Sequence, residues 1–326
     1  MYNLEYLINW YCLPAGLLNY ARSYSPYAIV TVPDNTHSGL AYQLAKKLKL
    51  PLVTDFQDLF PLSRFIVEFM EPYGWVRKFL LKKFFRLHKE SDLVFYTSEG
   101  MKDFFGEHEN GHVLYPVGDF NISQLPFKNE FAFSPKPIKI LYAGNCYGAY
   151  GRMLLNFSRL VKNSPEIQFK IYPVGKGWSD EDINEMKAAG IYQSFMPFEK
   201  LKTELEATDA FLTVMSFEKE ESPFVKTSFT TKWLDYAPYG KPIFVWGPQY
   251  SSGVVFAEKH NCGIIVTESD ARHLKDAIIQ TARNENSWRN YSRNAKTASE
   301  KVLNPNMIHS ILVNEINKVI IQKSDL

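Results

Sequence analysis

The stretch YAIVTVPDNTHSGLAYQLAKKLKLPLVTDF, residues 27–56, decides the fold class. YAIVTVP (27–33) is rich in β-branched and aromatic residues, which favours a strand. HSGLAYQLAKKLKL (37–50) has the pattern of a helix, and PLVTDF (51–56) opens a second strand. A strand, a helix and a strand in this order predict a parallel sheet covered by helices on both faces.

The same alternation extends in both directions along the chain. A long helical region is predicted from about Arg64 to Glu90, broken near 72–74, and EGMKDFF (99–105) is predicted to be a short helix. Helices alternate with strands again after residue 138 and close the chain in three C-terminal helices. The further predicted strands are DLVFYTS (92–98), HVLYPV (112–117), IKILYAGN (138–145), IQFKIYPVG (167–175), IYQSFMPF (191–198), AFLTVMSF (210–217), PIFVWGP (242–248) and CGIIVTE (262–268).

Between the two runs of strands, the chain from Gly118 to Pro137 has no clear period and several prolines, which is typical of an interdomain linker. The predicted fold class is therefore α/β, with two Rossmann-like domains that face each other across a cleft. We expect an N-terminal domain over 1–118, a linker over 119–137 and a C-terminal domain over 138–305. The last helix, 306–326, is expected to pack back on the N-terminal domain.

Composition narrows the class of protein. The 326 residues are 45% hydrophobic and 22% charged, as in soluble globular proteins. The formal net charge of +2 gives no general argument for a nucleic-acid partner. Cys12, Cys146 and Cys262 are far apart and lack metal-ligand spacing, which indicates reduced thiols in a cytoplasmic protein. No apolar run reaches membrane-spanning length, and the start resembles an amphipathic helix more than a signal peptide.

The segment SFTTKWLDYAPYGKPIFVWGP (228–248) carries polar residues that packing alone does not explain. A helix is predicted to begin near Thr230 or Thr231, with a hydroxyl as N-cap and Gly240 at its end. Its amino end, with Ser228 and Lys232, suits a phosphate, and Asp235 suits a ribose diol. The same residues also fit a capped helix with a solvated lysine.

Two further segments contain candidate site residues. IKILYAGNCYGAYGRM (138–153) is a predicted strand followed by a glycine loop and a helix with Arg152, so that backbone could approach a ligand closely or simply turn tightly. TDFQDLFPLSRF (54–65) places Asp55 and Asp58 at the carboxyl end of a strand. Asp58 is the better candidate for a substrate hydroxyl, and Asp55 fits a structural cap equally well.

The order of YAGN, the glycine loop, FTTKWLDYAPYGKPI and HNCGIIV resembles the C-terminal domain of GT-B glycosyltransferases, most similarly the retaining group called family 4. TDFQDLFP and ESDLVFYTSEGM resemble elements of the N-terminal domain of that family, so the resemblance covers about 90% of the chain. It implies transfer of a sugar from a nucleotide-diphosphate donor to a polysaccharide or lipid-linked acceptor. It also implies retention of configuration, and neither a metal nor any other cofactor.

Carried over position by position, the resemblance assigns roles to the residues of this chain. Catalytic roles fall to Lys232, Arg152 and Asp58. The acceptor and sugar side is assigned to Gln57 and His37. The expected donor-binding residues are Gly144, Asn145, Gly148, Met196, Pro197, Ser228, Thr231 and Asp235.

Three departures from the family pattern stand out. Thr227 occupies the position of the first of two glutamates, and Gln57 stands where many relatives have histidine. The first strand of the N-terminal domain and its glycine loop are not recognisable, so we expect an incomplete N-terminal domain. The missing unit and Thr227 favour a rival reading, a non-catalytic GT-B partner that binds a nucleotide sugar or a catalytic subunit. The retained lysine, aspartate and glycine loop speak against that reading. A dehydrogenase is not supported, because the glycine fingerprint is absent.

The segment WVRKFLLKKFFRLHK (75–89) interleaves basic and aromatic residues. As a helix it would be apolar on one face and strongly basic on the other, which suits an anionic membrane surface but equally suits a core helix with a solvated basic face. We therefore expect a cytoplasmic protein that could contact the inner face of the cell membrane.

Overall fold

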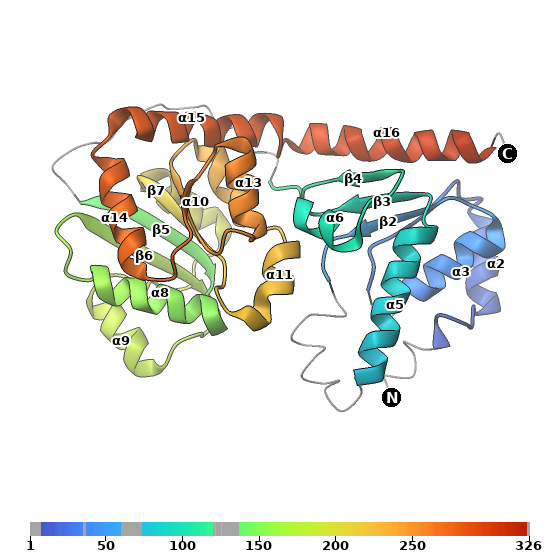
Figure 1. Cartoon of the computed structure of the whole chain (residues 1–326), viewed down its shortest axis with the longest axis horizontal. Helices are drawn as coiled ribbons and strands as arrows, with labels where there is room; N and C mark the ends of the chain where they lie inside the picture. The colour runs from blue at the N-terminus through green and yellow to red at the C-terminus, as the bar shows by residue number, and fades with distance from the viewer. Residues whose placement is uncertain are drawn as a thin grey trace. The chain divides into compact units, whose positions relative to one another are not determined.

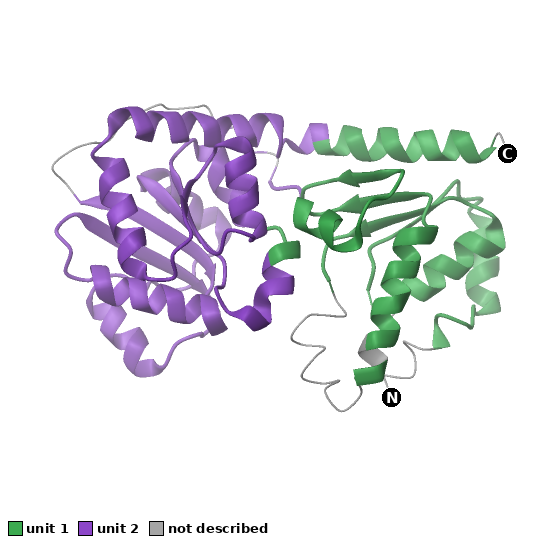
Figure 2. Cartoon of the chain, viewed as in Figure 1, with its two compact units in different colours: residues 1–115, 226–229, 308–326 green, residues 116–225, 230–307 purple. Residues whose placement is uncertain are grey.

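The computed structural model describes residues 8–34, 37–59, 74–119, 121, 125 and 137–324. The chain forms two compact units, shown in Figure 2. Unit 1 consists of residues 1–115, 226–229 and 308–326, and unit 2 of residues 116–225 and 230–307. This division differs from the expected continuous domain over 138–305, because residues 226–229 group with unit 1. Most of the expected linker, 119–137, lies outside the described residues.

Unit 1 is built on a parallel sheet with strand order β1-β2-β3-β4 (Figure 1). The strands are β1 (Ile29–Thr31), β2 (Leu52–Phe56), β3 (Leu93–Tyr96) and β4 (Gly111–Val113). The helices are α2 (Ala15–Ser23), α3 (Ser38–Leu48), α5 (Gly74–Glu90), α6 (Glu99–Phe105) and most of α16 (Pro305–Ser324).

The two faces of this sheet pack against different helices. Phe56 and Tyr96 point into one cluster together with Phe84 and Leu87 of α5 and Tyr42 of α3. The alternate residues of the strands point the other way, into a cluster with α16: Val53, Leu93, Phe95 and Val319. The period-2 alternation therefore gives a sheet with helices on both faces, as the sequence predicted.

Unit 2 contains a second parallel sheet, with strand order β6-β5-β7-β8-β9. Its strands are β5 (Ile138–Asn145), β6 (Ile167–Val174), β7 (Ala210–Val214), β8 (Ile243–Trp246) and β9 (Ile264–Val266). Its helices are α8 (Gly148–Val161), α9 (Asp180–Ala188), α10 (Phe198–Ala207), α11 (Ser222–Thr227, which ends in unit 1), α12 (Lys232–Tyr236), α13 (Ser252–His260), α14 (Ala271–Ala282) and α15 (Glu285–Lys301).

The larger core of unit 2 lies between this sheet and helices α8, α9 and α14. Tyr142 of β5, Phe157 of α8 and Ile278 of α14 belong to it. On the opposite face Phe211 of β7 stacks on Tyr236 of α12, with ring centroids 4.5 Å apart. This stacking fixes α12 against the sheet.

Some predicted elements differ from the structure. IYQSFMPF (191–198) is not a strand: it makes one isolated bridge, between Tyr192 and Ile171, and Phe195 is exposed. Pro197 ends the extended run, because it precedes the first residue of α10. Of the helical region predicted from Arg64 to Glu90, residues 64–73 lie outside the described residues. None of the described helices is both long and apolar enough to cross a membrane.

Candidate donor site of unit 2

The carboxyl end of β5 leads into the glycine loop that the sequence singled out. Gly144 has a φ of 138° and Gly148 a φ of 55°, backbone conformations that strongly favour glycine. A Cβ atom at Gly151 would lie 2.0 Å from the carbonyl oxygen of Cys146, so glycine is also required where α8 packs against the loop. The loop is therefore shaped for close backbone packing at the carboxyl edge of the sheet, where ligands bind in open α/β sheets.

Helix α12 brings Lys232 to this loop. The hydroxyl oxygen of Tyr236 accepts a hydrogen bond from the backbone N–H of Ala143, at 2.8 Å, and so ties α12 to β5. A Cβ atom at Gly144 would lie 3.0 Å from both Cε and Nζ of Lys232. The glycine thus leaves room for the ammonium group, and two segments about 90 residues apart in the chain meet at one place.

Burial shifts the pKa values of the two charged side chains beside the glycine loop, Lys232 and Asp235. Burial lowers the pKa of Lys232, an effect that the nearby Asp235 carboxylate opposes. Burial also raises the pKa of Asp235 to about 6, against the pull of the Lys232 ammonium. Both groups are therefore held in surroundings that disfavour their charges, a state common at functional sites.

The N-cap position of α12 falls on Thr231, as predicted, because the helix begins at Lys232. The Thr231 backbone is helical, and its side chain makes no capping hydrogen bond, which differs from the prediction. With only five residues, α12 offers no substantial helix dipole. Ser228, which was grouped with these residues, is buried and belongs to unit 1. The positive charge that this segment supplies comes from the Lys232 side chain and not from the amino end of α12.

Arg152 and Asn145 already have partners within the protein. Arg152, on the first turns of α8, forms an exposed ion pair with Glu218. Asn145 accepts a hydrogen bond from the backbone N–H of Tyr147 through Oδ1, at 2.7 Å. Its position is therefore fixed by the loop itself, whereas Arg152 would have to leave Glu218 to reach a ligand.

Met196 and Pro197 lie in the loop that leads into α10. The backbone of Tyr192 is bridged to Ile171 of β6, so this loop begins beside β6, an edge strand of the sheet. Met196 is half-buried and Pro197 exposed, at the position just before Phe198.

Of the candidates near the start of unit 1, Gln57 and His37 are held by local contacts. Gln57 donates a hydrogen bond from Nε2 to Asp55, at 2.8 Å. Burial raises the pKa of the Asp58 carboxyl. His37 is exposed, and its Nδ1 lies 2.6 Å from Asp34, which also accepts the backbone N–H of His37. These contacts explain His37 and Gln57 as parts of loop structure, and they leave Asp58 as the carboxylate to test.

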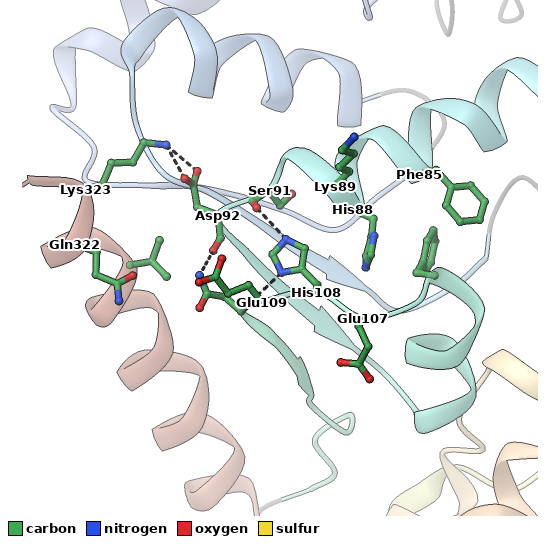
Figure 3. Close-up of a pocket in the computed structure, with 13 residues that line it drawn as sticks. Phe85, His88, Lys89, Ser91, Asp92, Glu107, His108, Glu109, Gln322 and Lys323 are labelled. Atoms are coloured by element: carbon green, nitrogen blue, oxygen red, sulfur yellow. Dashed lines mark hydrogen bonds and ion pairs between the residues drawn. The ribbon is translucent and has the colours of Figure 1, made fainter. Parts of the chain in front are cut away.

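Unit 1 also contains a cavity of about 760 Å³, shown in Figure 3, at the amino end of β3. His88 lies 2.7 Å from the hydroxyl of Tyr96, and burial lowers its pKa to about 4, so the ring is neutral. The two ring nitrogens of His108 contact the carbonyl of Ser91 and the backbone N–H of Asn110. The histidines of this cavity therefore serve the fold of unit 1, and we assign no ligand to it.

Sequence reasoning missed two tyrosines and a glutamate. Tyr142 lies two residues before Gly144, and Nζ of Lys232 is 4.9 Å from the centroid of its ring. Neither Tyr236 nor Glu218 was among the predicted site residues. Alternation along β5 could have placed Tyr142 on a definite face, but only the fold shows that Lys232 reaches it. Across the described parts of the chain, no group of three or more His, Cys, Asp and Glu side chains could hold a metal ion.

No protein-family model and no curated protein sequence matches the chain. Solved structures do. HepE of Anabaena, solved with UDP, has a TM-score of 0.67 at 14% identity, over 93% of this chain and 81% of that one. A glycosyltransferase of Rickettsia africae has a TM-score of 0.65 at 13% identity, over 97% and 81%. Sucrose-phosphate synthase of Thermosynechococcus elongatus has a TM-score of 0.64 at 13% identity, over 94% and 77%.

The chain has the GT-B fold. At these identities the likeness extends to the fold alone, which confirms the predicted class of two Rossmann-like domains. Membership of glycosyltransferase family 4 and an incomplete N-terminal domain stay predictions. Within the GT-B fold, β5, the glycine loop and α12 belong to the second domain, which is the one that the sequence assigned to the donor.

Proposed function

We propose that the chain is a glycosyltransferase that moves a sugar from a nucleotide-diphosphate donor to a polysaccharide or lipid-linked acceptor. The observation that carries the proposal is the Lys232 ammonium beside Gly144 at the carboxyl end of β5. HepE, of the same fold, was solved with UDP, which supports a nucleotide ligand here. Gly148, at the first turn of the 14-residue α8, adds backbone N–H groups suited to an anion.

In the proposed reaction, the bond between the anomeric carbon and the diphosphate oxygen breaks as the acceptor oxygen bonds to that carbon. The hydroxyl proton of the acceptor leaves with the diphosphate. Negative charge grows on the leaving group, and a preorganised cation stabilises that charge most when water is excluded. Lys232 would supply the first positive charge, and Arg152 a second after it parts from Glu218.

Asp235 is proposed to accept hydrogen bonds from the ribose hydroxyls, and Met196 and Pro197 to lie against the base. Thr231 and Asn145 are kept as donor-side contacts, and Asp58 as the carboxylate that meets the transferred sugar. With a pKa of about 6, Asp235 is mostly ionised at neutral pH and can act as an acceptor.

Calorimetry with UDP and GDP tests the donor site. We expect the wild type to bind one of them, and Lys232→Ala and Asp235→Ala to weaken binding by tenfold or more, since each removes a charge-assisted hydrogen bond. Lys187→Ala, an exposed lysine of α9, is the matched control and should bind as the wild type does. A folded wild type that binds neither nucleotide would refute the proposal.

Retention of configuration and independence of metal ions are part of the proposal, because the sequence resembles retaining enzymes that use protein cations. Slow hydrolysis of an α-linked donor such as UDP-glucose gives a direct readout. Proton NMR should show the α-anomer first, at a rate that a chelator leaves unchanged. A β-anomer, or activity that EDTA abolishes, would contradict this part.

We also propose that α5 contacts anionic membrane surfaces. Trp75, Lys78, Lys82, Phe85 and Lys89 fall on one stripe of this helix and are all exposed, Trp75 to 59%. The basic face is smaller than the sequence predicted, because Lys83 is buried against aromatic rings and Arg86 pairs with Glu90.

Vesicle co-sedimentation tests this contact. We expect the protein to sediment with vesicles containing phosphatidylserine at low salt, and the triple variant of Lys78, Lys82 and Lys89 to Gln to stay in solution. The matched control replaces the exposed lysines Lys47, Lys187 and Lys301 by Gln. Equal sedimentation of both triple variants would refute the assignment to α5.

A further inference from the structure

We propose that Tyr142 is the positioning residue of the donor site: its ring orients the Lys232 ammonium, and its hydroxyl fixes the glycine loop to which that ammonium points. The inference rests on the proposed function and extends it to a residue that contacts no reacting atom.

The ring of Tyr142 is placed to attract the ammonium group. Tyr142 is fully buried in β5, and Nζ of Lys232 lies 4.9 Å from its ring centroid. A cation over the face of an aromatic ring is attracted by the ring's quadrupole, and the attraction grows when water is excluded. Burial lowers the pKa of Lys232, so the ring offsets part of the desolvation that the charged form suffers.

The ring also restricts a flexible side chain. A lysine stem has four rotatable bonds, and its ammonium is otherwise free to sample many positions. Here the stem passes over Gly144, where a Cβ atom would lie 3.0 Å from Cε and Nζ. The Tyr142 ring and the bare backbone of Gly144 together define where the charge is held before any ligand binds.

The hydroxyl of Tyr142 fixes the glycine loop. It donates a hydrogen bond to the backbone carbonyl of Asn145, at 2.6 Å, at the last residue of β5. Asn145 in turn accepts the N–H of Tyr147, the residue before α8. The Tyr142 side chain therefore determines both the position of the Lys232 ammonium and the path of the glycine loop. It thereby fixes the distance between the ammonium and the loop.

A phenylalanine could fill the same volume in the core but could not hold the Asn145 carbonyl. A leucine would fill part of it but could not attract the ammonium. The two functions of Tyr142 are therefore separable by substitution. Phe157, fully buried in the same core and in contact with Phe169 and Trp246, is the matched control for lost packing.

The test compares Tyr142→Leu, Tyr142→Phe and Phe157→Leu in two measurements. In calorimetry, Tyr142→Leu should weaken UDP binding about tenfold and leave uridine binding unchanged, because only the diphosphate meets Lys232. Tyr142→Phe should have an intermediate effect. Phe157→Leu should lower the free energy of unfolding and leave UDP binding intact.

The second measurement needs no ligand. The pKa of Lys232, followed by NMR of the side-chain amine or by its reactivity toward an acylating reagent, should fall further in Tyr142→Leu and stay unchanged in Phe157→Leu. An unchanged Lys232 pKa in Tyr142→Leu would overturn the inference, whether or not UDP binds. UDP binding that Lys232→Ala weakens and Tyr142→Leu does not would also overturn it, while the proposed function would stand. If the wild type binds no nucleotide, the proposed function fails and the pKa alone decides the positioning.

Discussion

Lys83 in unit 1 and Lys232 in unit 2 both place an ammonium group over an aromatic ring, but they differ in the number of rings around that group. Around Lys83 lie three rings, of Trp10, Tyr11 and Phe79, with centroids 4.6 to 5.3 Å from Nζ. Lys232 has one ring, that of Tyr142, and one neighbouring glycine, Gly144. Three rings around Lys83 stabilise its charge within the fold. The single ring and the bare backbone beside Lys232 leave its ammonium group open to contact with a ligand.

The largest effect is expected at Asp235, the carboxylate that accompanies Lys232. Its folded-state pKa of about 6 exceeds the usual value of 3.8, so the folded protein disfavours the ionised form. The wild type should lose stability as pH rises from about 4 to about 6, by up to roughly 3 kcal/mol. Asp235→Asn should therefore be more stable than the wild type above pH 6 and similar near pH 4. Urea unfolding at several pH values measures this, and a difference that does not depend on pH would contradict it.

Exchanging the two lysines for methionine tests the comparison directly. Lys83→Met should lower the free energy of unfolding by about 1–2 kcal/mol, because the attraction to three rings is lost, and leave UDP binding unchanged. Lys232→Met should raise the free energy of unfolding, because burial disfavours that ammonium, and reduce UDP affinity. Urea unfolding and calorimetry on the same preparations measure both quantities. Equal losses of stability would show that the two lysines serve the same purpose.

The space beside Lys232 is tested at Gly144, with Gly106 as the matched control. Both glycines have a positive φ, 138° and 90°, so alanine at either should cost about 1 kcal/mol of stability. A Cβ atom at Gly106 would meet nothing within 4 Å, whereas at Gly144 it would press on Lys232. Only Gly144→Ala should weaken UDP binding, by about tenfold if one charge-assisted hydrogen bond is lost. Calorimetry that finds both variants equal to the wild type would remove Gly144 from the donor site.

The smallest effect is expected at Glu218, which pairs with Arg152. Exposed ion pairs contribute less than about 1 kcal/mol, so Glu218→Gln should release the guanidinium at little cost to the fold. If Arg152 then meets the diphosphate, UDP affinity should rise about threefold. The double variant with Arg152→Ala should lose that gain. A gain that survives in the double variant would exclude Arg152 as its source.

Hydrophobic periodicity was sufficient to predict two parallel sheets, because strands buried on both faces read as short apolar runs. It failed at 191–198, because apolar residues such as Phe195 are exposed there and the pattern of a single sequence does not show which residues are buried. Lys232 and the loop at Gly144 were both selected in advance, because lysine and glycine at such places have few packing roles. Their contact depends on Tyr236 joining α12 to β5, a tertiary hydrogen bond that spacing along the chain does not encode. The ion pair between Arg152 and Glu218 was missed for the same reason, whereas the partner of His37 is Asp34, only three residues away.

Helix α16 has a consequence for how the chain folds as it is made. Val319, Leu312 and Ile316 cover Val53, Leu93 and Phe95, which are buried in the sheet near the start of the chain. During synthesis from the amino end, those strands are complete some 200 residues before the helix that covers one of their faces. Unit 2 is formed from one stretch of the chain, 116–307, apart from residues 226–229. All its strands and core helices are therefore synthesised before α16 is complete. The second unit to be synthesised can therefore be the first to close its core, while the sheet of unit 1 keeps an apolar face uncovered until α16 is synthesised.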